Sequence, residues 1–214
     1  GGFSGNNIFK VRLSDQVVVA EASITSTGTI DDCVADGSGG VYFATSEGVF
    51  HRDASFNALS NIGCNVRAEA LAIDDEDNLY VVGEECLVSL DNGCDVEWSV
   101  RKYSSSGTLL DGHNFQSPSA VAWRAGYLYV GFRDIDVASP CNVVKLDLTD
   151  WSCVWSFRVG EANGTSPTLR PDIVRDIAVS DDGVYAVSNQ YLFQLADTDG
   201  TKNWCRKNEG LKDD

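Results

Sequence analysis

The residues best suited to chemistry in this sequence are aspartates gathered in short polar segments. Acidic residues cluster within 74–77, 147–150, 181–182 and 197–199. Carboxylates converging from a bent loop bind Ca²⁺, which takes about six to eight oxygens. Residues 197–200, "DTDG", begin like a calcium loop but lack the later Asp or Asn and the Glu that complete one. Because aspartate also caps its own backbone in tight turns, we expect turn residues, with Ca²⁺ as the alternative.

Seven cysteines and one glycosylation sequon favour an oxidising compartment. We therefore expect a secreted, extracellular or periplasmic protein, glycosylated at Asn163. A nucleophilic cysteine would need a histidine base, and the chain has only two histidines without a catalytic motif. No hydrolase elbow, zinc-protease motif or phosphate loop is present. These absences leave enzyme activity uncertain and make a non-catalytic protein the preferred interpretation.

Six of the cysteines are candidates for disulfides. A cross-strand bridge requires Cα atoms within about 7 Å. Cys86 and Cys94 flank one predicted hairpin turn, and Cys141 and Cys153 flank another, so both pairs are expected to bridge. The remaining candidates are Cys33 and Cys64. Cys205 is left over, either free or joined to something outside this chain.

The net charge of the chain limits the classes of partner that we expect it to bind. The formal net charge is −16, which repels phosphate backbones and excludes nucleic acid as an expected partner. A solvated acidic surface accounts for this charge, and affinity for Ca²⁺ or a basic partner is the alternative. No apolar run approaches the roughly 20 residues of a transmembrane helix, so membrane insertion is not expected. The missing Met and the start "GGFSGNN" predict a processed or excised chain.

One local pattern, in which a short apolar run and a turn precede hydrophobic-Tyr-hydrophobic, recurs four times. It centres on Tyr42, Tyr80, Tyr129 and Tyr185, at spacings of 38, 49 and 56 residues. Alternating apolar residues around an Asp-, Asn- or Gly-rich turn predict two antiparallel strands, a and b, in each copy. A fixed motif at irregular spacing indicates constant strands with variable loops.

A second predicted hairpin, strands c and d, follows each motif. Its copies begin near residues 48, 86, 142 and 191, and the opening residues 6–24 match c and d without a preceding a and b. Four short strands per repeat predict an all-β chain, a β-propeller of four-stranded antiparallel blades, rather than a sandwich or jelly roll. We expect one propeller domain or propeller fragment, with a half unit at 1–29 and full units at 30–68, 69–118, 119–174 and 175–214.

The c–d segments "VVKLDLTDWSCVW" and "LFQLADTDGTKNW" resemble the quinoprotein-type propeller repeat. That repeat places a Trp at the opening of the outer strand, where the resemblance aligns Trp98, Trp155 and Trp204. Ala20 or Glu21, and a residue near Ser60, take this position in the other units. The a–b hairpins are also similar to NHL-like propellers. The resemblance implies that the Trp residues pack between neighbouring blades, while Trp123 and Trp151, outside this register, are free for ligand stacking.

The cofactor of the quinoprotein-like dehydrogenases is not carried over. Those enzymes bind pyrroloquinoline quinone and Ca²⁺ through specific residues and adjacent cysteines, and this sequence has no adjacent Cys pair. We therefore expect no cofactor, with Ca²⁺ the one exception left open.

Binding residues are expected in the loops that join d to a and b to c, because these share one propeller face. The long ones are 104–118, 133–140 and 159–174, and long loops on a rigid scaffold commonly carry recognition. The candidates are His113, Asn114, Arg133, Asp134, Asp136, Arg170, Asp172, Arg175 and Asp176.

These patterns favour a non-catalytic extracellular propeller that binds a protein or glycan, or acts as a scaffold. One alternative is a propeller enzyme, either a quinoprotein-like oxidoreductase or a Ca²⁺-dependent hydrolase or lactonase. Another is a subunit of an extracellular filament or surface assembly. The N-terminal half unit presents an open sheet edge, so another chain or segment is expected to complete it.

Overall fold

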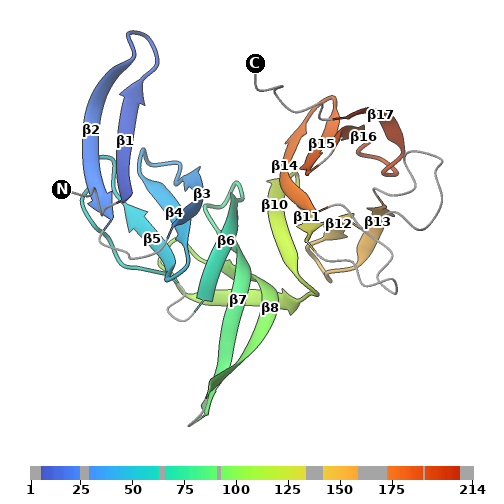
Figure 1. Cartoon of the computed structure of the whole chain (residues 1–214), viewed down its shortest axis with the longest axis horizontal. Coiled ribbons are helices and arrows are strands. Elements are labelled where there is room, and N and C mark those ends of the chain that lie inside the picture. The colour runs from blue at the N-terminus through green and yellow to red at the C-terminus, as the bar shows by residue number, and fades with distance from the viewer. Residues whose placement is uncertain are drawn as a thin grey trace, which may run out of the picture. The chain divides into compact units, whose positions relative to one another are not determined.

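The computed structural model describes residues 6–24, 29–62, 66–90, 93–133, 142–158, 173–189 and 191–207. Within these ranges the regular secondary structure is entirely β-strand, in antiparallel sheets that are the blades of a β-propeller (Figure 1). The chain forms two compact units, residues 1–97 with 101–111, and residues 98–100 with 112–214. No helix in the described residues is long and apolar enough to cross a membrane.

The first unit begins with the expected half blade. Strands β1 (Asn6–Arg12) and β2 (Val17–Ile24) form a two-stranded hairpin. The first full repeat follows as β3 (Ile30–Ala35), β4 (Val41–Thr45) and β5 (Gly48–Arg52). Its fourth position is irregular, since residues 58–62 are attached to β5 by two isolated antiparallel bridges, Arg52 to Ala58 and Val49 to Ile62.

The next repeat is a complete sheet, but its strands differ from the predicted ones. The order is β6 (Val66–Ile73), β7 (Leu79–Leu90), β8 (Gly93–Tyr103) and β9 (Leu109–Asn114). The segment from residue 86 was expected to form strands c and d, whereas it completes b and forms c, because the strand pattern continues unbroken from Leu79.

The predicted loop 104–118 is consequently wrong in its first part. Residues 104–108 form a tight turn, in which the Ser104 N–H donates to the Thr108 carbonyl at 2.9 Å and the Gly107 N–H to the Ser104 carbonyl at 2.8 Å. Gly107 has a φ of +85°, a conformation that favours glycine. The chain then returns as the outer strand β9, so the Ser-rich composition marked a hairpin turn.

The second unit contains two regular four-stranded blades. One is built by β10 (Pro118–Arg124), β11 (Tyr127–Phe132), β12 (Val143–Asp147) and β13 (Cys153–Phe157). The last is built by β14 (Val174–Ser180), β15 (Gly183–Ser188), β16 (Tyr191–Leu195) and β17 (Lys202–Lys207).

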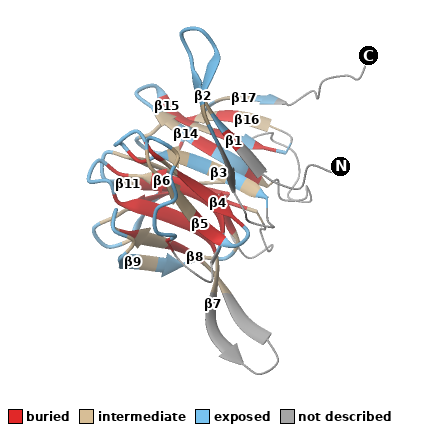
Figure 2. Ribbon diagram, turned by 90° about the vertical axis from the view of Figure 1, so that its left-hand side faces the viewer, coloured by how far each residue is buried: buried red, intermediate tan, exposed pale blue. Residues whose placement is uncertain are grey.

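Burial is continuous along the inner strands β4, β11 and β12, rather than alternating as the sequence pattern predicted. The motif tyrosines Tyr42, Tyr80 and Tyr129 are at most 2% exposed. Burying one such ring stabilises the fold by about 1.5–3 kcal/mol. Buried residues lie along strands such as β4 and β11, while the described hairpin turns are exposed (Figure 2).

The first strand of every four- or three-stranded sheet also contains a β-bulge near its start. The pairing register shifts across one residue in each of them. The residues skipped are Asp31, Glu69, Ser119 and Arg175. A bulge bends the strand and leaves one residue out of the hydrogen-bond ladder. The same bulge therefore recurs in each of these sheets.

Candidate functional site

The Trp register is confirmed in two blades and wrong in a third. Trp155 on β13 pairs with Lys145, and Trp204 on β17 pairs with Gln194, so both lie on outer strands. Trp98 lies instead on β8, the third strand of its sheet. Counting from the end of the hairpin turn, Asp111 on β9 takes the position that Trp155 and Trp204 occupy.

Trp155 packs between neighbouring blades, as the resemblance implied. It is 7% exposed, and its indole N–H donates to the carbonyl of Asp197 on the last blade at 2.8 Å. Gly200, in the same β16–β17 turn, lies against the ring, because a Cβ there would fall 2.6 Å from Trp155 Cε3. The turn between β16 and β17 thus forms the surface on which the indole packs.

A buried cation accompanies Trp155 in this contact. Lys145 Nζ lies 2.7 Å from Asp197 Oδ1 and donates to the Asp197 carbonyl at 3.0 Å. The Tyr129 hydroxyl donates to the same carboxylate. Burial alone would raise the pKa of Asp197, but the bonds from Lys145 and Tyr129 outweigh it, so the pKa is lowered.

In the two preceding blades, the residue at the position of Lys145 contacts a carboxylate of its own sheet. His51, which pairs with Tyr42 across β4 and β5, has its Nε2 2.8 Å from Asp36 Oδ2. In the following sheet the Lys102 Nζ lies 3.1 Å from Asp74 Oδ2.

The Tyr80 hydroxyl donates to the same carboxylate of Asp74 at 3.2 Å. Burial raises the pKa of Tyr80 to about 12. Burial would also raise the pKa of Asp74, but hydrogen bonds from Asn78 and the contact with Lys102 lower it overall. The carboxylate is therefore charged and the phenol neutral at ordinary pH.

We call the b-strand Tyr, the facing c-strand residue and the d-strand Trp of a blade its cross-strand row. In the last blade this row is Tyr185, Gln194 and Trp204. Gln194 Nε2 donates to the Tyr185 hydroxyl at 2.9 Å, and the rings of Tyr185 and Trp204 meet edge to face at 6.2 Å between centroids. Trp204 is half-buried, whereas its counterpart Trp155 is buried.

The acidic segments act as turns, as expected. Asp74 Oδ1 accepts the N–H groups of Glu76 and Asn78 at 3.0 and 2.8 Å. Asp147 and Asp199 each accept the N–H two residues ahead, at 2.9 Å. Among the described residues, no group of three or more His, Cys, Asp or Glu is arranged to hold a metal ion.

The binding candidate His113 and the stacking candidate Trp151 meet in one aromatic cluster with Phe115 and Phe132. His113 at the end of β9 is exposed and stacks on Trp151, with 5.8 Å between centroids and planes 17° apart. Phe115 lies 4.7 Å from His113 and 6.5 Å from Trp151, between ring centroids. Phe132 contacts Phe115 edge to face at 5.9 Å. Such pairs each contribute about 0.5–1.5 kcal/mol, so the cluster is a preformed surface.

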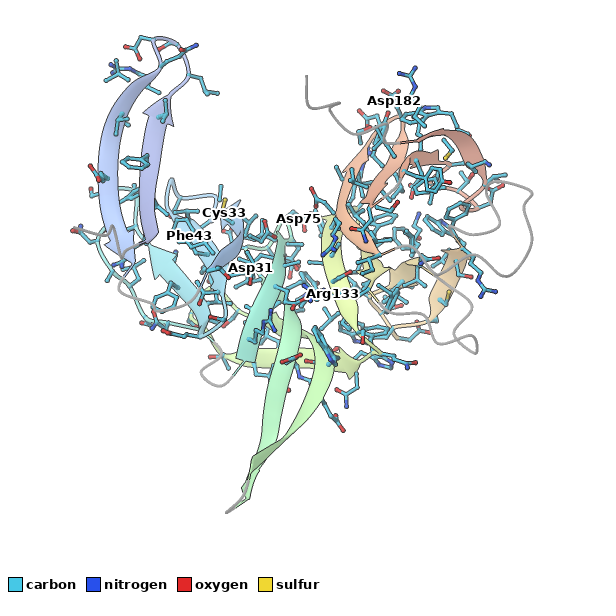
Figure 3. The ribbon with its side chains drawn as sticks, in the orientation of Figure 1. Asp31, Cys33, Phe43, Asp75, Arg133 and Asp182 are labelled. Atoms are coloured by element: carbon cyan, nitrogen blue, oxygen red, sulfur yellow. The ribbon has the colours of Figure 1, made fainter. Side chains whose placement is uncertain are left out.

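Arg133 follows β11 directly after Phe132 (labelled in Figure 3). Its guanidinium lies 5.9 Å from the centre of the Trp98 ring, a cation–π distance, and the backbone N–H of Arg133 donates to the Ser117 carbonyl at 2.9 Å. Asn114, the last residue of β9, is exposed between His113 and Phe115. The structure therefore places His113, Asn114 and Arg133 on or next to the aromatic cluster.

The other candidates lie elsewhere. Arg175 donates to Asn189 Oδ1 at 2.7 Å, and Asp176 Oδ1 accepts the Ile177 N–H at 2.8 Å, so both are tied to their own sheet. The remaining candidates lie outside the described residues: Asp134, Asp136, Arg170, Asp172 and the sequon residue Asn163.

The predicted bridge between Cys141 and Cys153 is not formed. Cys153 forms no disulfide in the described structure and lies at the turn end of its hairpin, where it pairs with Leu146. Asn142, which follows Cys141, bonds Phe157 at the other end of the same hairpin. Cys141 itself lies outside the described residues.

Cys33 and Cys205 are also free thiols, so the pairing of Cys33 with Cys64 is not formed either. Burial raises the pKa of both thiols. Cys64 lies outside the described residues. Cys86 and Cys94 lie on β7 and β8, with side chains outside the described part, so that pairing stays a prediction.

The strand order and blade repeats define a β-propeller, and solved structures agree. The WD40 domain of Pan2 from Neurospora crassa matches with a TM-score of 0.58 at 11% identity, over 84% of this chain and 50% of that one. A gluconolactonase from Xanthomonas campestris matches with a TM-score of 0.58 at 15% identity, over 81% and 60%. The extracellular domain of a putative hybrid two-component system from B. thetaiotaomicron matches with a TM-score of 0.57 at 12% identity, over 99% and 24%.

At these identities the likeness establishes the fold alone. The match spans 60% or less of each of these three chains. No protein-family model matches the chain, and no curated protein matches its sequence. The chain is therefore a β-propeller protein, while the narrower quinoprotein-type resemblance stays a prediction.

The cross-strand row was missed in the sequence, although a signal was present. His51, Lys102, Lys145 and Gln194 all follow the pattern apolar, any residue, polar within strand c. An alignment of the c strands on that polar position would have found them.

Proposed function

We propose that this protein is a non-catalytic extracellular β-propeller that binds a protein partner, with a glycan as the alternative ligand. The observation that carries the proposal is the aromatic cluster with Arg133 beside it. Trp and Arg are the residues that most often dominate binding energy at protein interfaces. A cluster already ordered by its own ring contacts loses little side-chain entropy on binding.

The surroundings of the cluster support recognition rather than blade packing alone. His113 and Asn114 are exposed, and Trp151 is half-buried on a turn with a φ of +59°. A non-glycine residue at positive φ is unusual and is commonly retained where a side chain must be displayed. An exposed imidazole stacked on an indole offers both an apolar surface and hydrogen-bonding atoms to a partner.

Extracellular location is part of the proposal. It is supported by the sequon, by the seven cysteines and by the likeness to the extracellular domain of a putative two-component system. Proteins of that compartment commonly present rigid β scaffolds whose loops and edges recognise partners. No cofactor is proposed, and Ca²⁺ content is measured directly by elemental analysis after dialysis against a chelator-free buffer.

Two Trp variants test the proposal with a matched control. Trp151→Ala removes the ring that stacks on His113, whereas Trp123→Ala removes another half-buried Trp, on β10, that makes no recorded ring contact among the described residues. Immobilised protein captures partners from the extracellular fraction of its source, and a glycan array is screened in parallel. We expect Trp151→Ala to weaken capture about tenfold or more and Trp123→Ala to leave it unchanged.

Equal binding by both variants would show that the cluster is structural. Failure of the wild-type protein to retain any protein or glycan would overturn the binding function itself. A stoichiometric Ca²⁺ ion together with turnover of a lactone would favour the propeller-enzyme alternative instead.

A further inference from the structure

One ring of the aromatic cluster, that of His113, can take up a proton. The chain has only one other histidine, His51, whose side chain is 13% exposed with its Nε2 2.8 Å from Asp36 Oδ2. That imidazole is held within its own blade, whereas His113 is exposed at the end of β9. Histidine is the residue type that ordinarily changes charge between pH 5 and 8. A proton on His113 therefore alters the surface on which we propose that a partner binds.

Two aromatic rings contact the imidazole of His113. The Trp151 ring is nearly parallel to it, with planes 17° apart and 5.8 Å between centroids. The Phe115 ring is tilted by 54° at 4.7 Å. Both distances lie within the roughly 6 Å over which an aromatic ring attracts a cation. A neutral imidazole stacks on these rings, and an imidazolium at the same place makes cation–π contacts with them.

The charged residues on the elements around the imidazole are mostly acidic. They are Asp111 on β9, Asp147 and Asp150 at the β12–β13 turn, Arg133 directly after β11, and Lys145 on β12. Lys145 is buried and paired with Asp197 of the last blade. Hydrogen bonds from Thr149 and Ser152 lower the pKa of Asp147 and Asp150, respectively, so these two carboxylates stay charged from pH 5 to pH 8. The charge that changes at the cluster in this range is that of His113.

The fixed positive charge of Arg133 lies against a different ring. Its guanidinium is 5.9 Å from the centre of the Trp98 ring, which is outside the cluster. When the imidazole is neutral, the cluster therefore presents uncharged aromatic faces close in sequence to the carboxylates of Asp147 and Asp150. The face of an aromatic ring carries partial negative charge, so rings next to carboxylates favour a cation. The formal net charge of −16 also attracts a basic partner to the protein as a whole.

We infer that the aromatic cluster binds a basic side chain of its protein partner and that protonation of His113 releases it. The inference rests on the proposed binding function and adds to it the chemistry of the contact and its control by pH. The imidazolium and the partner's cation compete for the ring of Trp151 and repel each other. Loss of one exposed cation–π contact together with this repulsion weakens binding about five- to tenfold.

Nuclear magnetic resonance tests the protonation step without any partner. The ring protons of His113 and the indole N–H of Trp151 are followed from pH 8 to pH 5. We expect both signals to move with one midpoint, because the two rings are in contact. In His113→Phe the Trp151 signal should stay in place. His51→Lys is the matched control, since lysine holds the equivalent position as Lys145, and its Trp151 signal should titrate as in the wild-type protein.

Peptides of defined charge test the chemistry of the contact. Capped hexa-arginine and capped hexa-glutamate peptides are titrated into the protein at pH 8 and pH 5, at one ionic strength. We expect the wild-type protein to bind hexa-arginine about five- to tenfold more weakly at pH 5. His113→Phe has no charge at either pH and His113→Lys is charged at both. Each should therefore bind almost equally at the two pH values, with His113→Phe the tighter of the two.

Three results would overturn the inference. They are a Trp151 signal that does not follow His113, a His113→Phe protein that loses hexa-arginine in acid as the wild-type protein does, and tighter binding of hexa-glutamate than of hexa-arginine. The proposed function is judged separately by capture of a natural partner. A partner retained equally at pH 8 and pH 5 leaves the binding function standing and refutes control by His113. The expected titrations without any captured partner or glycan refute the binding function alone.

Discussion

Replacing Gly200 by Ala probes the contact on which the blade junction depends. Gly200 lies against the Trp155 ring, and an added Cβ would fall 2.6 Å from Cε3 and 2.8 Å from Cδ2. Its φ of +70° is also strained for any residue with a Cβ. Gly126 is a matched control, because it has a φ of +85° and nothing within 4 Å of the position of its Cβ.

The two variants share one cost and differ in another. A left-handed φ costs an alanine about 1–2 kcal/mol, which applies to Gly126→Ala and Gly200→Ala alike. Only Gly200→Ala also forces the Trp155 ring to move, and overpacking of this kind costs about 1–3 kcal/mol. We therefore expect Gly126→Ala to lower the free energy of unfolding by about 1–2 kcal/mol and Gly200→Ala by about 2–5 kcal/mol.

Urea unfolding followed by far-UV circular dichroism measures both variants under the same conditions. A Trp155→Leu background supplies the internal check, since a smaller side chain leaves room for the new methyl group. There the excess cost of Gly200→Ala over Gly126→Ala should largely disappear. Equal costs for the two variants in the wild-type background would refute the packing of Trp155 on Gly200.

Three further predictions concern ionisation. The lowered pKa of Asp197 gives stability that is present above the ordinary value of 3.8 and lost as pH falls through the folded value, so unfolding becomes easier in acid. Lys145→Met should flatten this dependence in urea titrations, and an unchanged slope would contradict the ion pair. Because the pKa of Tyr80 is about 12 in the folded protein, its phenol ionises first in the unfolded chain, and the free energy of unfolding falls from about pH 10 upward. The phenolate absorbance of the folded protein should therefore include a late rise. A titration in which all phenolate absorbance appears in a single step near pH 10 would contradict this. Exposed Cys153 should react with a thiol reagent faster than Cys205, whose pKa is raised, and equal rates would argue against this difference.

The parts of the fold that repeat could be predicted from the sequence. Alternation around Tyr42, Tyr129 and Tyr185 indicated the inner hairpins, and these strands lie where the pattern placed them. The outer Trp was predicted correctly for Trp155 and Trp204, because in both cases a polar turn directly precedes the strand. In these blades the strand pattern and the turn residues indicate the same structure, and such agreement makes prediction from sequence reliable.

Prediction failed where one blade departs from the common strand lengths. β7 continues to Leu90, and its turn residues imitate a c–d hairpin, so Trp98 was placed one strand too far out. The aromatic cluster could not be predicted either. His113 and Trp151 are 38 residues apart and meet only because the outer strand of one blade lies near the turn of the next. Tertiary contacts of this kind carry no local signal.

The polar residue at the centre of the cross-strand row finds its partner in three different ways. Two blades have a carboxylate in their own a–b turn, Asp36 or Asp74, and pair it with His51 or Lys102 of the same blade. The blade from β10 to β13 has no such Asp, and its cation depends on Asp197 of the next blade. The last blade also lacks this ion pair, and Gln194 takes the place of the cation. A buried lysine there would need a carboxylate, whereas the amide of Gln194 donates within its own blade, to the Asp182 carbonyl at 3.0 Å and the Tyr185 hydroxyl at 2.9 Å.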